Sequence, residues 1–511
     1  MFRLNRVVRR VTGAAGEDLF LAHGIIMNNS PTCSVMVGNN GTGKSRLISD
    51  IARVFIYIRN LKELGVVGKD NRKASENFGR NFSISEIEYI CNGHKFLLKI
   101  SEQDNIKSFK DEEYCEISEC DVPERVIALT TSPFDKFPLS RDRRSFEHLY
   151  DNSEYDEDVE GFYHYIGLKE RMGRLSSHGL IFKTVENYAR IYCSPEENVA
   201  RMETILNYLS LRPIIKIRFY SKYGREIFEA AMRDDFIEYL QERSHNSFSL
   251  NSIRRFGGLH PESLKKVQQA IIRFRRRKET VNKRSEVVLD LNDRESSIAD
   301  LLTYLDDAYL LRRFGLVGLR SIEIQNIDGD VIDVMDASSG QINVMMAFFG
   351  LASVIKEDSL ILIDEPEISL HPEWQMRYME FLKQAFGTYF GCHYLIATHS
   401  PLVLSEVPEL NSFFVTLDNP KPAAIPTTEM SGRSSDYLLV QAFRSPAHNN
   451  YYLRDVVATL LKKAARGEID DSKYKNLMAV VSMIHEKLDK DDPMKVLIDG
   501  LLEVHEVENH D

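Results

Sequence analysis

Cysteine is scarce in this sequence, and its spacing is not that of a disulfide framework or a zinc site. The 511 residues include six cysteines, none of them in a CxxC pair. Structural zinc sites use closely spaced thiolates, and disulfide frameworks belong to oxidising compartments. We therefore expect reduced thiols in a cytoplasmic protein, with Cys115 and Cys120 as packing residues.

Long apolar runs and an excess of positive charge are also lacking. The apolar segment at 342–355, INVMMAFFGLASVI, is shorter than the roughly 18 to 20 residues that span a bilayer and is typical of a buried helix. The N-terminus, MFRLNRVVRRV, alternates like a strand and has no signal-peptide apolar region. A net charge of −11 argues against a uniformly basic nucleic-acid-binding coat. With 43% hydrophobic and 28% charged residues, we expect a soluble globular protein without a membrane partner.

What the sequence does contain is a glycine-rich segment at 37–47, VGNNGTGKSRL. Its pattern Gly38-x-x-x-x-Gly43-Lys44-Ser45 matches the phosphate-binding loop (P-loop), whose glycines let successive backbone N–H groups converge on phosphate oxygens. An apolar run, CSVMV, precedes it, and a helical pattern, RLISDIARVFIYI, follows. This is the strand, loop and helix context that the motif requires. The alternative is a glycine-rich turn that matches by chance.

The P-loop motif predicts a role for each of its residues. Lys44 would reach the β- and γ-phosphates of ATP, and the Ser45 hydroxyl would ligate Mg²⁺. The partial positive charge of the helix N-terminus would face the same phosphates. The residues that we expect to bind ATP here are Gly38, Asn39, Asn40, Gly41, Thr42, Gly43, Lys44, Ser45 and Arg46.

An acidic pair follows a second buried strand, in the segment SLILIDEP at 359–366. A continuous apolar run is typical of a central parallel strand, and ligands of open α/β sheets bind at the carboxyl ends of such strands. We expect Asp364 to hold Mg²⁺ through water beside Ser45. We expect Glu365 to act as the general base or to polarise the attacking water. The alternative is a strand that ends in a solvated acidic turn.

The next apolar strand, in HYLIATHSPLVL at 393–404, ends at His399. A neutral imidazole at this edge could donate a hydrogen bond to the γ-phosphate and take part in catalysis. A histidine at a strand end is more often a simple polar cap.

A short polar segment, DASSGQ at 336–341, directly precedes the apolar helix. Its Ala-Ser-Ser-Gly-Gln run resembles the LSGGQ signature of ABC-type ATPases, with Ser339 in place of a glycine. The order of P-loop, signature, DEP and THS resembles that of ABC ATPases and of SMC-like repair and defence ATPases. The resemblance implies an α/β fold: an ABC-type P-loop core with a mixed sheet, flanking helices, an antiparallel β subdomain and a large, mainly helical insertion.

The same resemblance implies a dimer. In that family the signature, here Ser338, Gly340 and Gln341, contacts the γ-phosphate held by the P-loop of a second protomer. A small-residue turn at a helix N-terminus is a suitable anion site. One P-loop and one signature per chain therefore imply a homodimer or higher oligomer with shared sites for ATP and Mg²⁺. The segment at 368–371 stands where the family's dimer-crossing loop lies.

Spacing predicts the domain organisation. Lys44 and Asp364 are about 320 residues apart, whereas a minimal nucleotide-binding core needs about 150 to 200. Hairpins are predicted around Asn92-Gly93 and at 320–336. A core strand that leads into a loop is predicted at 125–138. In ABC proteins such a strand precedes the glutamine loop, but no glutamine follows it here, so that role stays unassigned. We expect an N-terminal core half at 1–139, a helical insertion at 140–315, a C-terminal core half at 316–430 and a helical tail at 431–511 that could bind a partner.

One helix of the insertion carries a basic run, RFRRRK at 273–278. Its apolar positions Leu264, Val267, Ile271 and Phe274 predict one buried face. The arginines could follow a nucleic-acid backbone, but such a run is more often a solvated helix face.

The chain as a whole resembles the ATPases of bacterial anti-phage defence, in particular PtuA, the ATPase subunit of Septu systems and of their retron-associated versions. SPFDKFP, the compact insertion and SSDYLLVQAF carry this narrower resemblance. It implies slow ATP hydrolysis, a partner HNH-type nuclease (PtuB), and a reverse transcriptase with its multicopy DNA and RNA. Two alternatives stay open: a DNA-repair ATPase of the RecF or SMC-like type, and an enzyme of the overcoming-lysogenization-defect type with its own nuclease activity.

Overall fold

The computed structural model places most of the chain and separates it into two compact units. The first unit comprises Met1–Pro138 and Lys356–Asp511, and the second comprises Leu139–Ile355. The described residues are 1–10, 16–24, 30–39, 41–63, 82–103, 105–139, 161–169, 184–185, 187–189, 191–192, 196–221, 229–236, 238–239, 261–280, 286–292, 298–313, 316–334, 336–407, 411–417, 424–427, 432–466, 472–488 and 491–508. Residues 316–355, which the sequence analysis assigns to the C-terminal core half, cluster with the second unit.

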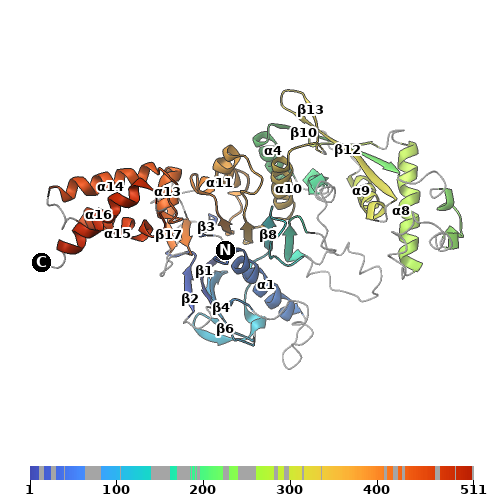
Figure 1. The fold of residues 1–511 in the computed structure, drawn as a ribbon. Coiled ribbons are helices and arrows are strands. Elements are labelled where there is room, and N and C mark those ends of the chain that lie inside the picture. Colours follow the sequence, from blue (N-terminus) through green and yellow to red (C-terminus); the bar gives the residue numbers. More distant parts are fainter. Residues whose placement is uncertain are drawn as a thin grey trace. The chain divides into compact units, whose positions relative to one another are not determined.

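A buried, mostly parallel sheet forms the centre of the first unit (Figure 1). In this unit its strands follow the order β17-β16-β3-β15-β14-β8, and all neighbours are parallel except β17 and β16. The strands are β3 (Thr32–Val37), β8 (Val126–Thr130), β14 (Leu360–Asp364), β15 (His393–Thr398), β16 (Ser412–Thr416) and β17 (Ala424–Pro426). Every residue of β3, β8, β14, β15 and β16 is buried, as expected for strands covered on both faces.

Helices join these strands so that the carboxyl ends of β3, β14 and β15 meet at one edge. The helices are α1 (Lys44–Glu63), α11 (Pro372–Phe386) and the short α12 (Pro401–Leu404). Helix α1 begins directly after the glycine-rich loop and packs against β14, β15 and β8. The α/β fold with a P-loop core, predicted from the sequence, is thereby confirmed.

An antiparallel sheet completes the core of this unit, with the strand order β2-β1-β4-β5-β6-β7. Its strands are β1 (Phe2–Arg9), β2 (Glu17–Phe20), β4 (Ile84–Cys91), β5 (His94–Ile100), β6 (Ile106–Lys110) and β7 (Glu113–Cys115), followed by the 3-10 turn η1 (Ile117–Glu119). Asn92 and Gly93 connect β4 and β5 with φ of 51° and 82°, the conformation that favours Asn-Gly in two-residue hairpins. The hairpin predicted here is confirmed.

The two sheets are tied together by a buried histidine at the start of β15. The Nδ1 atom of His393 accepts the Leu4 backbone N–H at 2.9 Å, and its Nε2 atom lies 2.8 Å from the Ser34 hydroxyl oxygen. Because Ser34 donates its own proton to the Leu21 carbonyl at 2.6 Å, it accepts from His393. These contacts fix a neutral ring with the proton on Nε2. Complete burial lowers the pKa of His393 from 6.5 to about 3, and nearby Arg3 adds to the effect.

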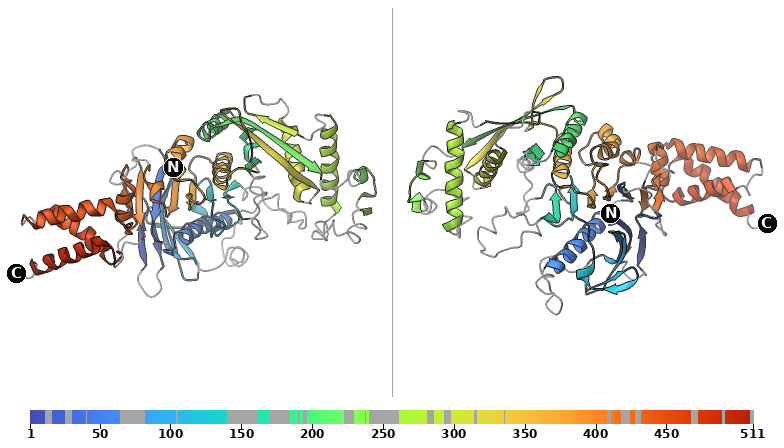
Figure 2. Two further views of the ribbon diagram at one scale, coloured as in Figure 1. Left: turned by 45° about the horizontal axis from the view of Figure 1, so that its top comes forward. Right: turned by 180° about the vertical axis from the view of Figure 1, so that it is seen from behind.

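The C-terminal part of the first unit is a packed group of helices (Figures 1 and 2). They are α13 (Ser435–Gln441), α14 (Tyr451–Ala464), α15 (Ser472–His485) and α16 (Pro493–Glu508). Leucine, valine, isoleucine and methionine side chains, together with the buried Tyr474, form their shared core. Throughout the described residues, each helix is too short or too polar to traverse a lipid bilayer.

The second unit combines helices with a four-stranded antiparallel sheet of order β11-β10-β12-β13. Its elements are β9 (Tyr163–Ile166), α4 (Glu196–Tyr208), β10 (Leu211–Ser221), α8 (Pro261–Thr280), β11 (Glu286–Asp290), α9 (Ile298–Arg313), β12 (Val317–Asn326), β13 (Val331–Asp333) and α10 (Ser339–Val354). The predicted hairpin of β12 and β13 is confirmed, whereas β10 and β11 were not expected from the sequence.

Helix α8 buries the apolar face that the sequence predicts. Leu264, Val267, Ile271 and Phe274 are all buried, and Phe274 stacks on Tyr304 of α9 with ring centroids 4.9 Å apart. Arg273 of the basic run forms a bidentate ion pair with Asp307 of α9 at 2.8 and 2.7 Å. At least this arginine therefore fastens the two helices together.

Candidate functional site

The P-loop connects β3 to α1 through two glycines in the left-handed region. Gly41 has φ of 84° and Gly43 has φ of 88°, conformations that residues with a β-carbon rarely adopt. A β-carbon at Gly41 would meet no atom of the described part of the chain within 4 Å. The Thr42 hydroxyl closes the curl by donating to the Asn39 carbonyl at 2.9 Å. Asn40, which the sequence assigns to the loop, lies outside the described residues.

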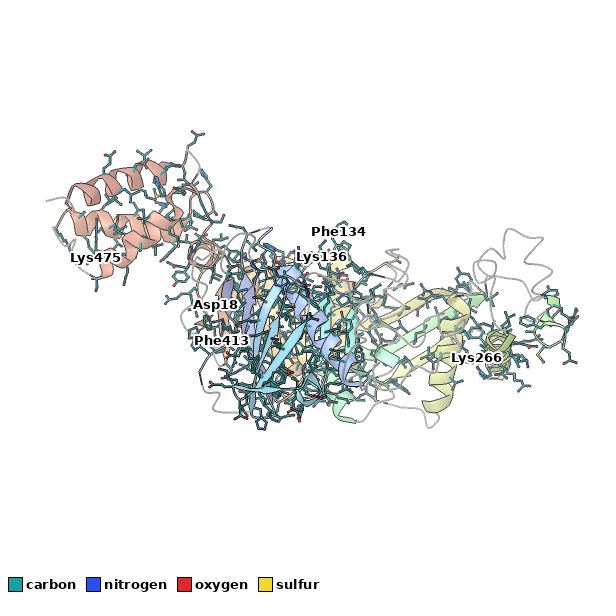
Figure 3. The ribbon with its side chains drawn as sticks, turned by 90° about the horizontal axis from the view of Figure 1, so that it is seen from below. Asp18, Phe134, Lys136, Lys266, Phe413 and Lys475 are labelled. Carbon is teal, nitrogen blue, oxygen red and sulfur yellow. The ribbon has the colours of Figure 1, made fainter. Side chains whose placement is uncertain are left out.

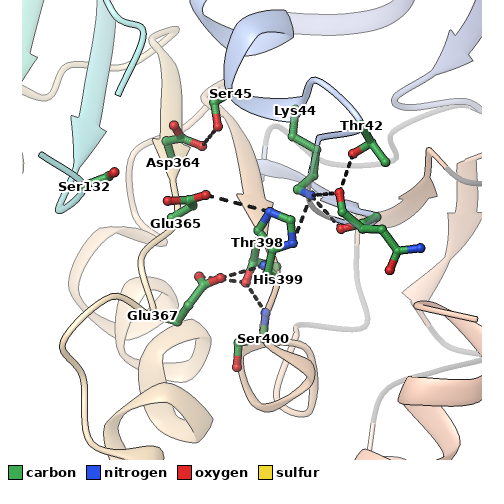
Figure 4. Close-up of polar contacts among 12 residues, drawn as sticks. Thr42, Lys44, Ser45, Ser132, Asp364, Glu365, Glu367, Thr398, His399 and Ser400 are labelled. Carbon is green, nitrogen blue, oxygen red and sulfur yellow. Dashed lines mark hydrogen bonds and ion pairs between the residues drawn. The ribbon is translucent and has the colours of Figure 1, made fainter. Parts of the chain in front are cut away.

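The Lys44 ammonium group is held inside this curl (Figure 4). Its Nζ atom donates to the Gly38 carbonyl at 2.6 Å and lies 3.3 Å from the Asn39 carbonyl. Its third contact is the His399 Nδ1 atom, at 3.2 Å. Since an ammonium group can only donate, Nδ1 accepts and the proton of a neutral His399 ring is on Nε2. The structure thus brings together two residues that follow different strands, Lys44 after β3 and His399 after β15.

Two oxygen ligands suitable for Mg²⁺ face each other beside the lysine. The Ser45 hydroxyl donates to Asp364 Oδ1 at 3.0 Å. Burial, followed by the charge of Glu365, raises the pKa of Asp364 to about 7, and the Ser45 hydrogen bond opposes this rise. Hydroxyl and carboxylate oxygens are ligands that Mg²⁺ accepts, usually together with water and substrate phosphates. A cation between them would favour the charged carboxylate, so this pair fits the ion.

Glu365 stands at the carboxyl end of β14 in an unusual conformation. Its φ is 50°, and its backbone is fixed by two hydrogen bonds: Glu365 N–H donates to the Ala397 carbonyl at 2.9 Å, and the Thr131 hydroxyl donates to the Glu365 carbonyl at 3.1 Å. The side chain is 27% exposed, and its Oε1 atom lies 3.8 Å from His399 Nε2. The carboxylate is thus held at the open edge of the sheet, where a water molecule can reach it.

A second glutamate, Glu367, joins this group although no motif in the sequence predicts it. Its Oε1 atom accepts the His399 backbone N–H at 2.6 Å, and its Oε2 atom accepts the Thr398 hydroxyl at 2.8 Å (Figure 4). Burial raises the pKa of Glu367, and these hydrogen bonds oppose the rise. In the sequence both glutamates belong to the acidic run DEPE, and such a run is equally compatible with solvated residues of a turn.

Arg9 is a further residue near the P-loop that no sequence motif predicts. From the end of β1, its guanidinium donates to the Thr42 carbonyl of the P-loop and pairs with Glu17 of β2. A β-carbon at Gly43 would come within 3.3 Å of the same guanidinium. The antiparallel sheet therefore supports the P-loop from one side. Arg46, expected in the nucleotide site, is exposed in the first turn of α1.

The loop after β8 reaches the same edge without a glutamine. Asp135 is buried, accepts the Phe137 backbone N–H at 2.9 Å, and its charge contributes to the raised pKa of Asp364. The Ser49 hydroxyl of α1 anchors the loop by donating to the Lys136 carbonyl at 2.6 Å. Phe134 in this loop is 81% exposed, and Figure 3 shows it at the surface near Lys136.

The signature residues are found in the second unit, at the N-terminus of α10. Ser338 caps the helix: its hydroxyl accepts the Gln341 backbone N–H at 3.3 Å, and Gln341 Oε1 accepts the Ser338 N–H at 3.2 Å. Ser338 is exposed and Gly340 is buried. The first unit therefore contains Lys44, Asp364 and Glu365, while the signature residues cap a helix of the second unit.

Comparisons with known proteins agree with an ATPase site. Residues 216–405 match the family model described as "AAA domain, putative AbiEii toxin, Type IV TA system". Over 464 residues the chain is 22% identical to "Retron Vc95 probable ATPase" of Vibrio cholerae serotype O1 biovar El Tor, covering 87% of this chain and 81% of that protein. A shorter match to "Protein ea59" of Escherichia phage lambda is 42% identical over 72 residues and spans 14% of each protein.

Among solved structures, the chain is similar to heads of SMC proteins. The SMC head domain from Thermotoga maritima aligns with 83% of this chain and 98% of that chain, at 11% identity and a TM-score of 0.32. The Smc head domain from Pyrococcus furiosus, solved with the C-terminal domain of ScpA, aligns with 84% of this chain and 98% of that chain, at 11% identity and a TM-score of 0.29.

The class of protein follows from the residues themselves together with the sequence matches. A P-loop after β3 and an Asp-Glu pair at the end of β14, with β15 between these two parallel strands, define a P-loop ATPase whose residues 216–405 are similar to the AAA domain model. Its sequence similarity extends over most of a retron-associated ATPase.

Proposed function

We propose that this chain binds and hydrolyses ATP as the ATPase subunit of a bacterial anti-phage defence complex. The observation that carries the ATPase proposal is the convergence of Lys44, Ser45, Asp364, Glu365 and His399 at one sheet edge. Similarity to a retron-associated ATPase over most of both chains supports the defence context.

In the proposed reaction, the P-loop N–H groups and Lys44 bind the β- and γ-phosphates. Ser45 and Asp364 would hold Mg²⁺, which supplies neutralisation of the phosphate charge when bound. Glu365 accepts a proton from, or orients, the water that attacks the γ-phosphate. His399, whose Nε2 carries the proton, then donates toward the γ-phosphate.

We further propose that two chains close around ATP, with Ser338 and Gly340 of one chain completing the site of the other. The exposed N-terminus of α10, whose Ser338 is accessible to solvent, supports this role because the N–H groups at a helix start favour anions. Closure would depend on ATP, so nucleotide turnover would set the lifetime of the dimer. Such a dimer would hold and control a separate HNH-type nuclease, as in Septu and retron systems.

The first experiment measures ATP chemistry directly. Purified chain with Mg²⁺ and labelled ATP should release phosphate, and light scattering after size exclusion should detect a dimer that forms with ATP and dissociates after hydrolysis. Chain that neither binds ATP nor releases phosphate would contradict the ATPase proposal. Chain that hydrolyses ATP as a strict monomer would contradict only the shared site.

The second experiment tests the defence context. Cells that carry this gene together with its neighbouring genes should resist phage, and Lys44→Ala should abolish the protection. Purified chain alone should leave DNA intact, while the co-purified complex should contain a nuclease. Nuclease activity of the chain alone would favour the overcoming-lysogenization-defect type. Sensitivity of a deletion strain to DNA damage, without any effect on phage, would favour a repair ATPase.

A further inference from the structure

We propose that Glu367 is a positioning residue for ATP hydrolysis: it fixes the loop that carries His399 and thereby sets the imidazole between Lys44 and Glu365. This inference rests on the proposed ATPase function and extends it to a residue outside the expected motifs. Among the described residues, Glu367 forms no hydrogen bond with the P-loop or with the metal ligands. Its charge does contribute to the raised pKa of Asp364, and the Glu367→Gln variant, which removes the charge and keeps the hydrogen bonds, separates that effect from positioning of His399.

The first support is that both carboxylate oxygens of Glu367 are used on the end of β15. Oε1 accepts the His399 backbone N–H at 2.6 Å, and Oε2 accepts the Thr398 hydroxyl at 2.8 Å. The Thr398 hydroxyl oxygen in turn accepts the Ser400 N–H at 3.0 Å. Charge-assisted hydrogen bonds of this kind are roughly twice as strong as neutral ones and are directional. Glu367 therefore fixes the backbone on both sides of the His399 α-carbon.

The second support is that the network closes on itself through α11. The Ser400 hydroxyl donates to Gln375 Oε1 at 2.7 Å. The amide of Gln375 donates to the Leu370 carbonyl at 3.0 Å and lies 3.4 Å from the Glu367 carbonyl. The turn after β14 and the loop after β15 are thus joined by side chains at two points. A closed network holds its members more rigidly than separate pairs do.

The consequence concerns the geometry of the His399 ring. Its two nitrogens contact opposite sides of the site: Nδ1 is 3.2 Å from Lys44 Nζ, and Nε2 is 3.8 Å from Glu365 Oε1. A displacement of the loop would change both distances together. Misplacement of a catalytic group by about 1 Å can cost about 100-fold in rate, while phosphate binding by the P-loop would be little affected.

The test compares three variants in ATP binding and single-turnover hydrolysis. Glu367→Ala should keep the ATP dissociation constant within about threefold and slow hydrolysis by about 10- to 100-fold. Glu367→Gln should recover most of the rate, because its amide oxygen can still accept the His399 N–H and its amide group can donate to Thr398. Glu373→Ala is the matched control, since it removes an exposed carboxylate from the first turn of α11. It should behave like the wild type.

A double-mutant cycle separates positioning from a general loss of structure. If Glu367 acts through His399, Glu367→Ala added to His399→Ala should cause little further loss of rate. The inference would be overturned if the rate losses of the two single variants add in the double variant. It would also be overturned if Glu367→Ala is fully active, or if it loses ATP affinity as much as rate. Hydrolysis by the wild type with an unaffected Glu367→Ala overturns this inference alone. A wild type that binds no ATP overturns the proposed function and this inference together.

Discussion

The buried His393 provides a stability prediction with a definite sign and size. In the folded chain its ring is neutral, because Nδ1 accepts from Leu4 and Nε2 donates to Ser34. The pKa falls from 6.5 to about 3 on folding. Between these values the unfolded chain binds a proton that the folded chain does not, so the free energy of unfolding decreases as the pH falls below 6.5.

The magnitude follows from linkage. Between pH 8 and pH 5 the single histidine removes about 2 kcal/mol of stability, since each pH unit below the unfolded pKa costs about 1.4 kcal/mol. His393→Asn cannot titrate but can still accept the Leu4 N–H. We expect it to be less stable than the wild type at pH 8 by about 1 to 3 kcal/mol, through the lost Ser34 contact and lost packing. Its pH dependence over the same range should be smaller by about 2 kcal/mol.

The assay is urea unfolding at pH 8 and pH 5, followed by the fluorescence of the one tryptophan, Trp374. This residue lies on α11 in the same unit as His393 and reports that unit's unfolding. His371→Asn is the control, because His371 is exposed and asparagine also caps a helix well. If His393→Asn keeps the wild-type pH dependence within about 0.5 kcal/mol, the assigned burial of a neutral ring is wrong.

The remaining predictions concern the nucleotide site. Lys44→Ala should abolish tight ATP binding, because it removes the cation of the P-loop; unchanged affinity in a titration would contradict the site. Glu365→Gln should keep ATP affinity while slowing turnover by about 100-fold or more and trapping an ATP-bound dimer, and normal steady-state turnover would exclude Glu365 as the group that orients water. Ser338→Arg should fold and bind ATP but block dimer closure. Mixed with Lys44→Ala, it should restore at most one complete site per heterodimer, whereas equal inactivity of the mixture, with heterodimers detected by mass, would count against a shared site.

Local sequence patterns were sufficient for the central strands and the P-loop. The mostly apolar segments directly before Gly38 and at Leu360–Ile363 have no partly exposed position, and the structure places them in buried parallel strands. The Asn92-Gly93 turn is similarly local, because its two positive φ values select those residues. Structural features of this kind depend on residues that are adjacent in the sequence, so they can be predicted from it.

Residues that act through distant partners were not predictable in this way. In the sequence Arg9 is one of several arginines in an N-terminal strand. Its contact with the P-loop arises because the folded sheet, in which β1 pairs with β4, brings the end of β1 to the Thr42 carbonyl. Glu367 is separated by 32 residues from the backbone N–H of His399 that it accepts. The β10 and β11 strands also depend on tertiary pairing, since β10 pairs with β12 across a long intervening segment. Their sequences carry no turn that would place them together.

The contacts of Lys44 indicate what nucleotide binding must change. Its ammonium group now donates to two P-loop carbonyls and to the His399 ring, so its positive charge is directed at groups of the protein. Phosphate oxygens carry a full charge and would be stronger acceptors than a neutral imidazole nitrogen. ATP would therefore compete for the lysine and release His399 Nδ1. Because Glu367 and Thr398 hold the backbone around His399, the ring rather than the loop would turn, and its Nε2 proton would then be available to the γ-phosphate.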